Sequence, residues 1–179
     1  MAEAFSNSLT RAVGVVTTYS GSSVGIASTA ITVTANTGIG VSDLVDNTNF
    51  LAGTKVHSIV GTKVYVDRAS TNTAAATAQI VNFLGVTTAY TSPSGTKSIL
   101  IGGTFANNTD SQVTLSVEVF DQSADKTVGI AHKIPVPTGS SFVISDAGKT
   151  LLEGLDEVRV YSSTAGAIDV NLSILTGVS

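Results

Sequence analysis

The chain has no cysteine and no tryptophan, and it holds only three prolines among 179 residues. Without cysteine, neither a disulfide nor a thiolate nucleophile or thiolate metal ligand is available, and cysteine usage gives no indication of the redox compartment. Aromatic residues make up 6% of the chain, which weakens an assignment as a carbohydrate-binding module, because sugars stack on aromatic rings.

Charge is also scarce. Charged residues are 12% of the chain, against about 25% in an average soluble protein, and the formal net charge is −4 with no basic cluster. Nucleic-acid binding requires cationic side chains that replace phosphate counterions, so we expect no nucleic-acid partner. An anionic membrane surface is excluded for the same reason. No apolar run reaches the roughly 20 residues that span a bilayer, and no secretory signal is evident at the start of the chain.

Serine and threonine replace the missing charges. The sequence holds 22 serines and 25 threonines, while 42% of its residues are hydrophobic. A surface rich in hydroxyl groups is solvated without strong repulsion between like charges, so it suits a protein that packs against copies of itself. The alternative is a secreted β-protein that is threonine-rich for other reasons.

A period of two in hydrophobicity indicates strands from Val13 onward. It is clearest in residues 113–119, where four apolar residues alternate with polar ones, and again in residues 168–174. Turn signals separate many short runs of this kind. The pattern predicts an all-β fold whose C-terminal module, residues 85–179, is an antiparallel β-sandwich or jelly roll.

The first half of the chain contains two internal echoes. Gly53-Thr54-Lys55-Val56 returns as Gly61-Thr62-Lys63-Val64, which predicts a tight hairpin around Gly61. Residues 14–20 and residues 85–91 also resemble each other. If these two segments are copies, residues 15–84 form a small β module inserted into the chain, with a boundary near Gly85; the alternative is chance similarity between threonine-rich strands.

Pro135 and Pro137 mark a corner. Proline has no backbone donor and a fixed φ, so Pro-x-Pro does not lie inside a central β-ladder. Strand-like runs flank the corner on both sides. We therefore expect an edge strand here, or a crossing at which the chain leaves one sheet and enters another.

Residues 1–14 are predicted to form an N-terminal docking arm. Phe5 and Leu9 lie four residues apart, which fits one turn of helix or an extended segment. Segments of this kind are disordered unless something ties them down, and the sharper hypothesis is that the arm orders against a neighbouring subunit. On that hypothesis, deletion of residues 2–12 leaves folding intact and abolishes incorporation into an assembly.

The sequence gives little indication of catalysis, a cofactor or a metal. His57 and His132 lie in predicted strands without zinc-ligand spacing. The carboxylates of Asp110, Asp121, Asp125 and Asp146 fall in turns, where aspartate caps backbone donors. Glu153 and Asp156 have the composition of a glycosidase pair, but a turn before a strand also explains them. We expect no enzyme, and a hydrolase using these two residues is the weakest hypothesis.

Four segments carry a resemblance to small virion structural proteins of tailed phages, notably marine cyanobacterial phages. The start Met1-Ala2-Glu3-Ala4-Phe5 is similar as well, and residues 15–84 resemble a small β module of phage fibre and surface proteins. In chain order the four segments are Ser98-Ile99-Leu100-Ile101-Gly102, Pro135-Val136-Pro137-Thr138-Gly139-Ser140-Ser141, Gly148-Lys149-Thr150-Leu151-Leu152-Glu153-Gly154-Leu155-Asp156 and Ala165-Gly166-Ala167-Ile168-Asp169-Val170.

The resemblance implies a virion component, assembled in the host cytoplasm by protein–protein contacts on the outside of the capsid, neck or tail. Its expected partners are other virion proteins and copies of the same chain. The interface residues that we predict are Phe5, Leu9, Ile168, Val170, Leu172 and Ile174. The alternative is an adhesin or carbohydrate-binding module that uses Tyr65, Tyr161 or Phe50 as stacking platforms.

Overall fold

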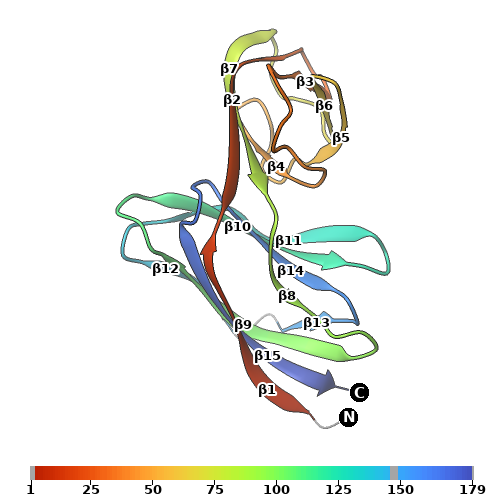
Figure 1. Ribbon diagram of the computed structural model, residues 1–179, viewed down its shortest axis with the longest axis vertical. Coiled ribbons are helices and arrows are strands. Elements are labelled where there is room, and N and C mark those ends of the chain that lie inside the picture. The colour runs from red at the N-terminus through yellow and green to blue at the C-terminus, as the bar shows by residue number, and fades with distance from the viewer. Residues whose placement is uncertain (1–2, 146–148, 179) are drawn as a thin grey trace. The chain divides into compact units, whose positions relative to one another are not determined.

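The structure is a computed structural model that describes residues 3–145 and 149–178 (Figure 1). Met1, Ala2, Asp146 and Gly148, on which some of the expectations above rest, lie outside the described residues. Every regular element in the described part is a β-strand, and all of the strand pairs are antiparallel. The predicted all-β class is confirmed.

The chain divides into two compact units. Unit 1 contains residues 1–14 and 87–179, and unit 2 contains residues 15–86. The module expected from the sequence spans residues 15–84. Unit 2 begins at the same residue and ends two residues later. Residues 1–14, expected as a separate arm, belong to unit 1.

One sheet of unit 1, called sheet 1, contains both the first and the last strand of the chain. The strand order is β1, β15, β9 and β12, and β13 pairs with β9 next to β12. The strands are β1 (Ala4–Val13), β9 (Lys97–Asn107), β12 (Ser141–Ile144), β13 (Thr150–Leu152) and β15 (Ile168–Val178).

The other sheet of unit 1, called sheet 2, has the order β11, β10, β14 and β8. Its strands are β8 (Thr87–Thr91), β10 (Val113–Asp121), β11 (Lys126–Val136) and β14 (Glu157–Ser162). The alternation predicted for residues 113–119 holds only in part: Val113, Leu115 and Val117 are at most 1% exposed, but Ser116 and Glu118 are also buried, at 4% and 2%, and Val119 is half-buried.

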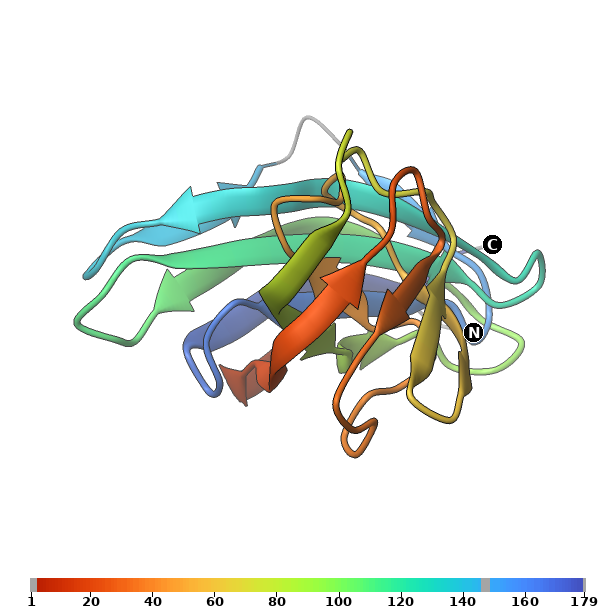
Figure 2. The ribbon, with the colours of Figure 1, turned by 90° about the horizontal axis from the view of Figure 1, so that it is seen from above.

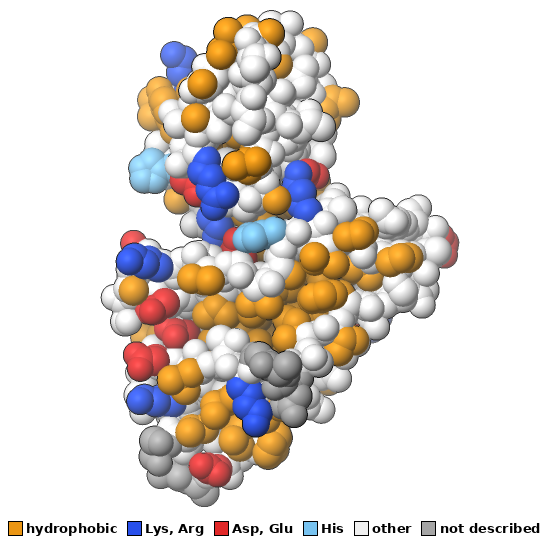
Figure 3. Space-filling view, turned by 180° about the vertical axis from the view of Figure 1, so that it is seen from behind, with side chains coloured by type: hydrophobic (Ala, Val, Ile, Leu, Met, Phe, Trp, Pro, Cys, Tyr) orange, Lys and Arg blue, Asp and Glu red, His pale blue; other side chains and the backbone are white. Residues whose placement is uncertain are grey.

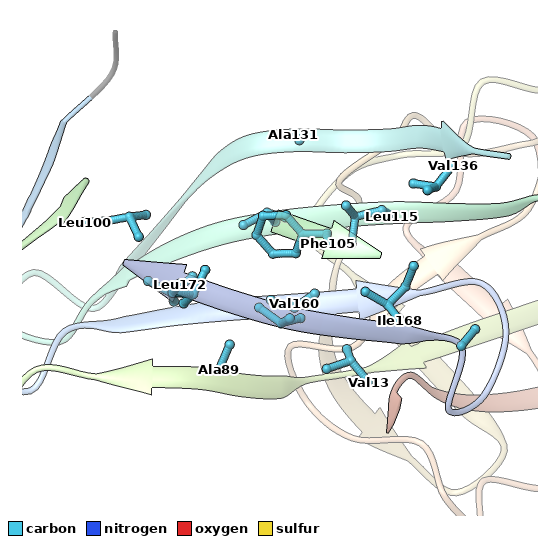
Figure 4. Packing of buried hydrophobic residues seen from close by; sticks show 14 of the residues in the cluster. Val13, Ala89, Leu100, Phe105, Leu115, Ala131, Val136, Val160, Ile168 and Leu172 are labelled. Carbon is cyan, nitrogen blue, oxygen red and sulfur yellow. The ribbon is translucent and has the colours of Figure 1, made fainter. Parts of the chain in front are cut away.

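The two sheets of unit 1 enclose one hydrophobic core. Phe105 and Leu172 from sheet 1 and Leu115 and Val160 from sheet 2 are all fully buried. Figure 4 shows these side chains between the ribbons of the two sheets. Each fully buried side chain of this size contributes about 1.5–3 kcal/mol from apolar burial. Unit 1 is therefore a β-sandwich, as the sequence predicted.

The corner at Pro135 and Pro137 is where the chain crosses between the sheets. Pro135 lies on β11, an edge strand of sheet 2, opposite Thr114. After a turn, in which the Ser140 N–H donates to the Pro137 carbonyl over 3.2 Å, the chain enters β12 of sheet 1. Because an edge strand has one side without a ladder, a missing donor is tolerated there. The sequence-based prediction of an edge and a crossing is confirmed.

Of the two local structures expected for the N-terminal segment, the extended one is present, but the segment is part of a sheet of its own unit and not a separate arm. Residues 4–13 form β1, a strand of sheet 1 that pairs with β15 along almost its whole length (Figure 1). Ser8 and Thr10 turn toward sheet 2, and their hydroxyls donate to the carbonyl of Ala89 over 2.7 and 3.5 Å. The segment is held by its own unit and needs no neighbour to become ordered.

Unit 2 contains one sheet, called sheet 3, in the order β4, β7, β2, β3, β6 and β5. The predicted hairpin around Gly61 is confirmed by β5 and β6, whose register ends at Val60 opposite Lys63. Figure 2 shows β2 and β7 running side by side. The strands are β2 (Val15–Val24), β3 (Ala30–Thr32), β4 (Leu44–Asp46), β5 (Val56–Val60), β6 (Lys63–Val66) and β7 (Ala76–Gly85).

Sheet 3 curls until its two outer strands meet. Leu44 on β4 forms a bridge with Lys55, the residue just before β5. The N–H of Val45 donates to the Thr54 carbonyl over 2.8 Å, and the N–H of Val56 donates to the Asp43 carbonyl over 2.9 Å. The curled sheet surrounds a second core, rich in valine, that includes Phe83 with no exposed area.

Candidate functional site: the outer face of sheet 1

The outer face of sheet 1 carries a row of apolar side chains. Phe5 lies opposite Leu175, Leu175 opposite Ile99, and Ile99 opposite Leu151, so the row crosses four adjacent strands. Their sequence neighbours Leu100, Leu152 and Ile174 are buried at 0–1% exposure. Because side chains alternate along a strand, the four members of the row, called the apolar row, point away from the core.

Two shallow hollows lie on the same sheet. The first has a volume of about 480 Å³ and is lined by Phe5, Asn7, Ile101 and Ser173, among others. The second has a volume of about 330 Å³ and is lined by residues of β1, β9 and β15, including Leu9. Both are open depressions in a sheet surface, which suit contact with another surface better than enclosure of a small molecule.

Two charged residues, Arg11 and Asp169, line the second hollow. The Asp169 carboxylate is already engaged in unit 1. Its Oδ1 accepts the N–H of Ala12 over 2.9 Å and the amide of Asn108 over 3.3 Å. Asp169 therefore fastens the end of β1 rather than offering a free carboxylate.

A glycine pair shapes the central strand of this face. The register between β15 and β9 shifts at Gly102, and Ile101 is the extra residue. A Cβ at Gly103 would lie 2.7 Å from Leu172 Cδ2. The sequence-based interpretation of Gly102 and Gly103 as a bulge or a close backbone approach is therefore confirmed in both senses.

The predicted interface residues separate into two groups. Phe5 and Leu9 are 74% and 72% exposed on β1. Ile168, Val170, Leu172 and Ile174 are 0–3% exposed and belong to the core of their own chain, so their predicted place in an interface is corrected. The last strand is also not an edge, because β1 covers one side of β15 and β9 covers the other.

The proposed stacking platforms are mostly buried. Phe50 is 5% exposed in the core of unit 2, and Tyr161 has no exposed area. The Tyr161 hydroxyl donates to Glu118 Oε2 over 2.9 Å inside unit 1. Neither ring is available to a sugar, which corrects the expectation for these two residues; Tyr65 is half-buried on β6.

The histidines and the carboxylate pair have separate structural surroundings. His57 is exposed on β5 of unit 2, and His132 is half-buried on β11 of unit 1. Asp156 is 4% exposed, and its carboxylate accepts the N–H groups of Gln122 and Glu153 over 3.0 and 2.8 Å. Asp156 thus holds the turn before β14, as the sequence allowed. In residues 3–145 and 149–178, no three metal-ligating side chains come together.

Sequence reasoning missed a cluster on sheet 2. The Arg159 guanidinium lies 3.7 Å from the centre of the Phe120 ring, and its Nε donates to Glu157 Oε2 over 2.7 Å. Glu157 and Arg159 are two residues apart on one strand, and Phe120 lies opposite Glu157. The i, i+2 charge pair was visible in the sequence, but the cross-strand partner was not.

Among the residues that the structure describes, two aspartates have pKa values that depart from the ordinary one. Burial raises the pKa of Asp43 above its ordinary value of 3.8, although a hydrogen bond from the Gly40 N–H works in the opposite direction. In the turn between β10 and β11, hydrogen bonds from the Ala124 N–H and the Ser123 hydroxyl lower the pKa of Asp121. Both carboxylates cap backbone donors, as expected of aspartate in turns.

Comparison with known proteins gives no relative: no protein-family model, no curated protein and no solved structure matches this chain. In the part of the chain that the structure describes, we find no helix with the length and apolar character needed to cross a membrane.

Proposed function

We propose that this protein is a structural subunit of a tailed-phage particle, bound to other virion proteins on the outside of the capsid, neck or tail. The observation that carries the proposal is the apolar row on the outer face of sheet 1. When one face of an antiparallel sheet covers a core, the other face is normally polar. Here four strands each place an apolar side chain on the solvent side, and Phe5 and Leu151 are 74% and 51% exposed.

The rest of the surface of unit 1 supports the same proposal. Figure 3 shows hydrophobic side chains gathered over a broad area of unit 1, and Val128 on β11 is 67% exposed. A contiguous apolar area on a protein with few charges favours contact with another protein surface. The resemblance to virion proteins supplies the kind of partner.

Purified particles of the phage that encodes this chain provide the test. We expect an antibody raised against the recombinant chain to detect it in density-purified particles at a constant ratio to the major capsid protein. Leu151→Glu places a charge in the apolar row and should lower incorporation by about tenfold, the result of losing roughly 1.4 kcal/mol of binding free energy. Val60→Glu, at a site 66% exposed in unit 2, is the matched control. Absence of the wild-type chain from particles would contradict the proposal.

The adhesin alternative loses support from the geometry. Two of its three stacking candidates, Phe50 and Tyr161, are buried in the cores of the two units. A glycan array in which the wild-type chain binds a defined sugar, and in which Tyr65→Ala abolishes that binding, would revive it.

A further inference from the structure

Strand β1 is the outermost strand of sheet 1, with β15 as its neighbour in the sheet. Its register with β15 is regular from Ala4 to Thr10 and then shifts before Val13. At the shift, Ala12 has a φ of +56°, and its N–H donates to Asp169 rather than to the ladder. The straight part of the edge is therefore a seven-residue segment whose middle residue is Asn7.

The other edges of unit 1 carry devices that discourage pairing with another chain. Edge strand β11 contains Pro135 together with Lys126 and Lys133. Strand β8 is 5 residues long, while β12 and β13 have 4 and 3 residues. Strand β1 is 10 residues long, has no proline, and is uncharged from Ala4 to Thr10. Long uncharged edges of this kind readily accept another strand.

The chemistry of β1 is symmetric about Asn7. Ser6 and Ser8 flank it, Phe5 and Leu9 come next, and Glu3 and Arg11 lie four residues away on either side. In an antiparallel pair of identical strands centred on Asn7, residue 5 of one strand lies opposite residue 9 of the other, and residue 3 lies opposite residue 11. Within the straight part, each apolar residue then meets an apolar residue; Glu3 and Arg11, just beyond its two ends, carry opposite charges.

We propose that β1 pairs antiparallel with β1 of a second copy of the chain, about a two-fold axis at Asn7. Such an interface is isologous and closes after two copies. Phe5 and Leu9 point to the same outer face. Phe5 of each copy would therefore pack against Leu9 of the other copy. The apolar row would thereby continue across the junction into the second sheet 1. This inference goes beyond the proposed function and does not depend on it.

The absence of cysteine makes a direct test simple. Asn7→Cys places two identical thiols opposite each other at the two-fold axis, where cross-strand Cβ atoms lie within reach of a disulfide. Asn171→Cys is the matched control, because Asn171 is exposed on the same face but one strand further in, opposite Leu9. Under mild oxidation we expect Asn7→Cys to form a covalent dimer about tenfold faster than Asn171→Cys, in line with a locally raised thiol concentration.

A charge test defines the register. In Phe5→Lys/Leu9→Lys, two like-charged pairs would face each other across the axis, while in Phe5→Glu/Leu9→Lys both pairs would be opposite in charge. The two variants change the same exposed sites, so folding should be equal by circular dichroism. By analytical ultracentrifugation, we expect dimerisation of the first variant to be about tenfold weaker than that of the second, because cross-strand like charges repel and opposite charges attract.

The outcomes decide the inference separately from the proposed function. A wild-type chain that stays monomeric at all concentrations, with equal oxidation rates for the two cysteine variants, overturns β1 self-pairing. A dimer that is equally strong in both charge variants also overturns it, because another surface must then hold the copies together. Absence from phage particles together with a β1-centred dimer would sink the virion proposal and leave this inference standing.

Discussion

The outer strands of the sheets are paired differently in the two units. In unit 2, the outer strands β4 and β5 are joined through the bridge between Leu44 and Lys55. In unit 1, the outer strands remain edges, and one of them, β1, lacks both proline and charge over its straight part. Backbone donors and acceptors at an open edge favour pairing with another chain. On the proposed self-pairing of β1, association would therefore depend on unit 1, while the outer strands of unit 2 are already bridged to each other.

Deleting residues 3–12 should have the largest effect on stability. Loss of structure in unit 2 as well would contradict the difference between the two units. The deletion removes β1 and exposes the flank of β15, whose buried side chains include Ile168 and Leu172. A domain is stable by only about 5–15 kcal/mol, so we expect unit 1 to unfold. Hydrogen exchange by mass spectrometry should then show lost protection in unit 1 and retained protection in unit 2.

This expectation reverses the one drawn from the sequence, in which the shortened chain folds normally. A truncated chain that retains full amide protection in β15 would restore the docking-arm hypothesis and contradict the observed pairing.

Next in size are two matched core truncations. Phe105→Ala in unit 1 and Phe83→Ala in unit 2 each empty a site with no exposed area. Each should cost about 3–5 kcal/mol in the free energy of unfolding. Because the two cores are separate clusters, we expect each variant to lose amide protection mainly in its own unit. Equal loss in both units from either variant would show a single cooperative core.

Replacing one glycine in each unit should have a smaller effect on the free energy of unfolding. Gly14, where the chain leaves unit 1, has a φ of +130°, and an added Cβ would clash with the Thr164 carbonyl oxygen. Gly61 in the hairpin of unit 2 has a φ of +57° and open space around it. Gly61→Ala should cost about 1 kcal/mol and Gly14→Ala about 3 kcal/mol, measured by denaturant unfolding. Equal costs would mean that the close approach at Gly14 relaxes freely.

The smallest effect is a difference in pH dependence. Asp43 of unit 2 has a raised pKa in the folded state, so the folded form binds more protons than the unfolded form, and its ionisation lowers the stability of unit 2 as the pH rises above 3.8. Asp121 of unit 1 has a lowered pKa, so its contribution is present above 3.8 and is lost as the pH falls toward its folded pKa.

An NMR titration of the side-chain carboxyl carbons checks both directions. The midpoint of Asp43 should lie above 3.8 and that of Asp121 below it. In Asp43→Asn, the loss of unit 2 stability with rising pH should disappear. Midpoints in the reverse order would contradict the assigned roles of burial and turn hydrogen bonds.

The sequence predicted the sandwich strands where apolar residues face the core, as at Val113, Leu115 and Val117, but period-two alternation placed Ser116 and Glu118 outside although both are buried. It failed at β1 because the pattern there is inverted. Ser8 and Thr10 face inward and bind the Ala89 carbonyl, while Phe5 and Leu9 face outward. Period-two reasoning assumes that the apolar side is the buried side, so it could not recognise this strand.

The interface prediction failed on the last strand for a related reason. Alternation in residues 168–174 shows which side chains are apolar, but not whether both edges of the strand are paired. That pairing comes from β1 and β9, and β1 lies at the opposite end of the sequence. Long-range register of this kind leaves no local signal, whereas the Pro135–Pro137 corner was predictable because a proline acts on its own backbone.

Residue-resolved amide exchange of the wild-type chain, at low and at high protein concentration, tests the central claim most directly. Alternate N–H groups of a strand point to opposite edges, so at low concentration every second amide from Ala4 to Thr10 should exchange rapidly. At high concentration these amides should become protected, while the amides of unit 2 stay unchanged. Full protection of β1 at the lowest concentration, or a gain of protection confined to unit 2, would contradict an open edge in unit 1.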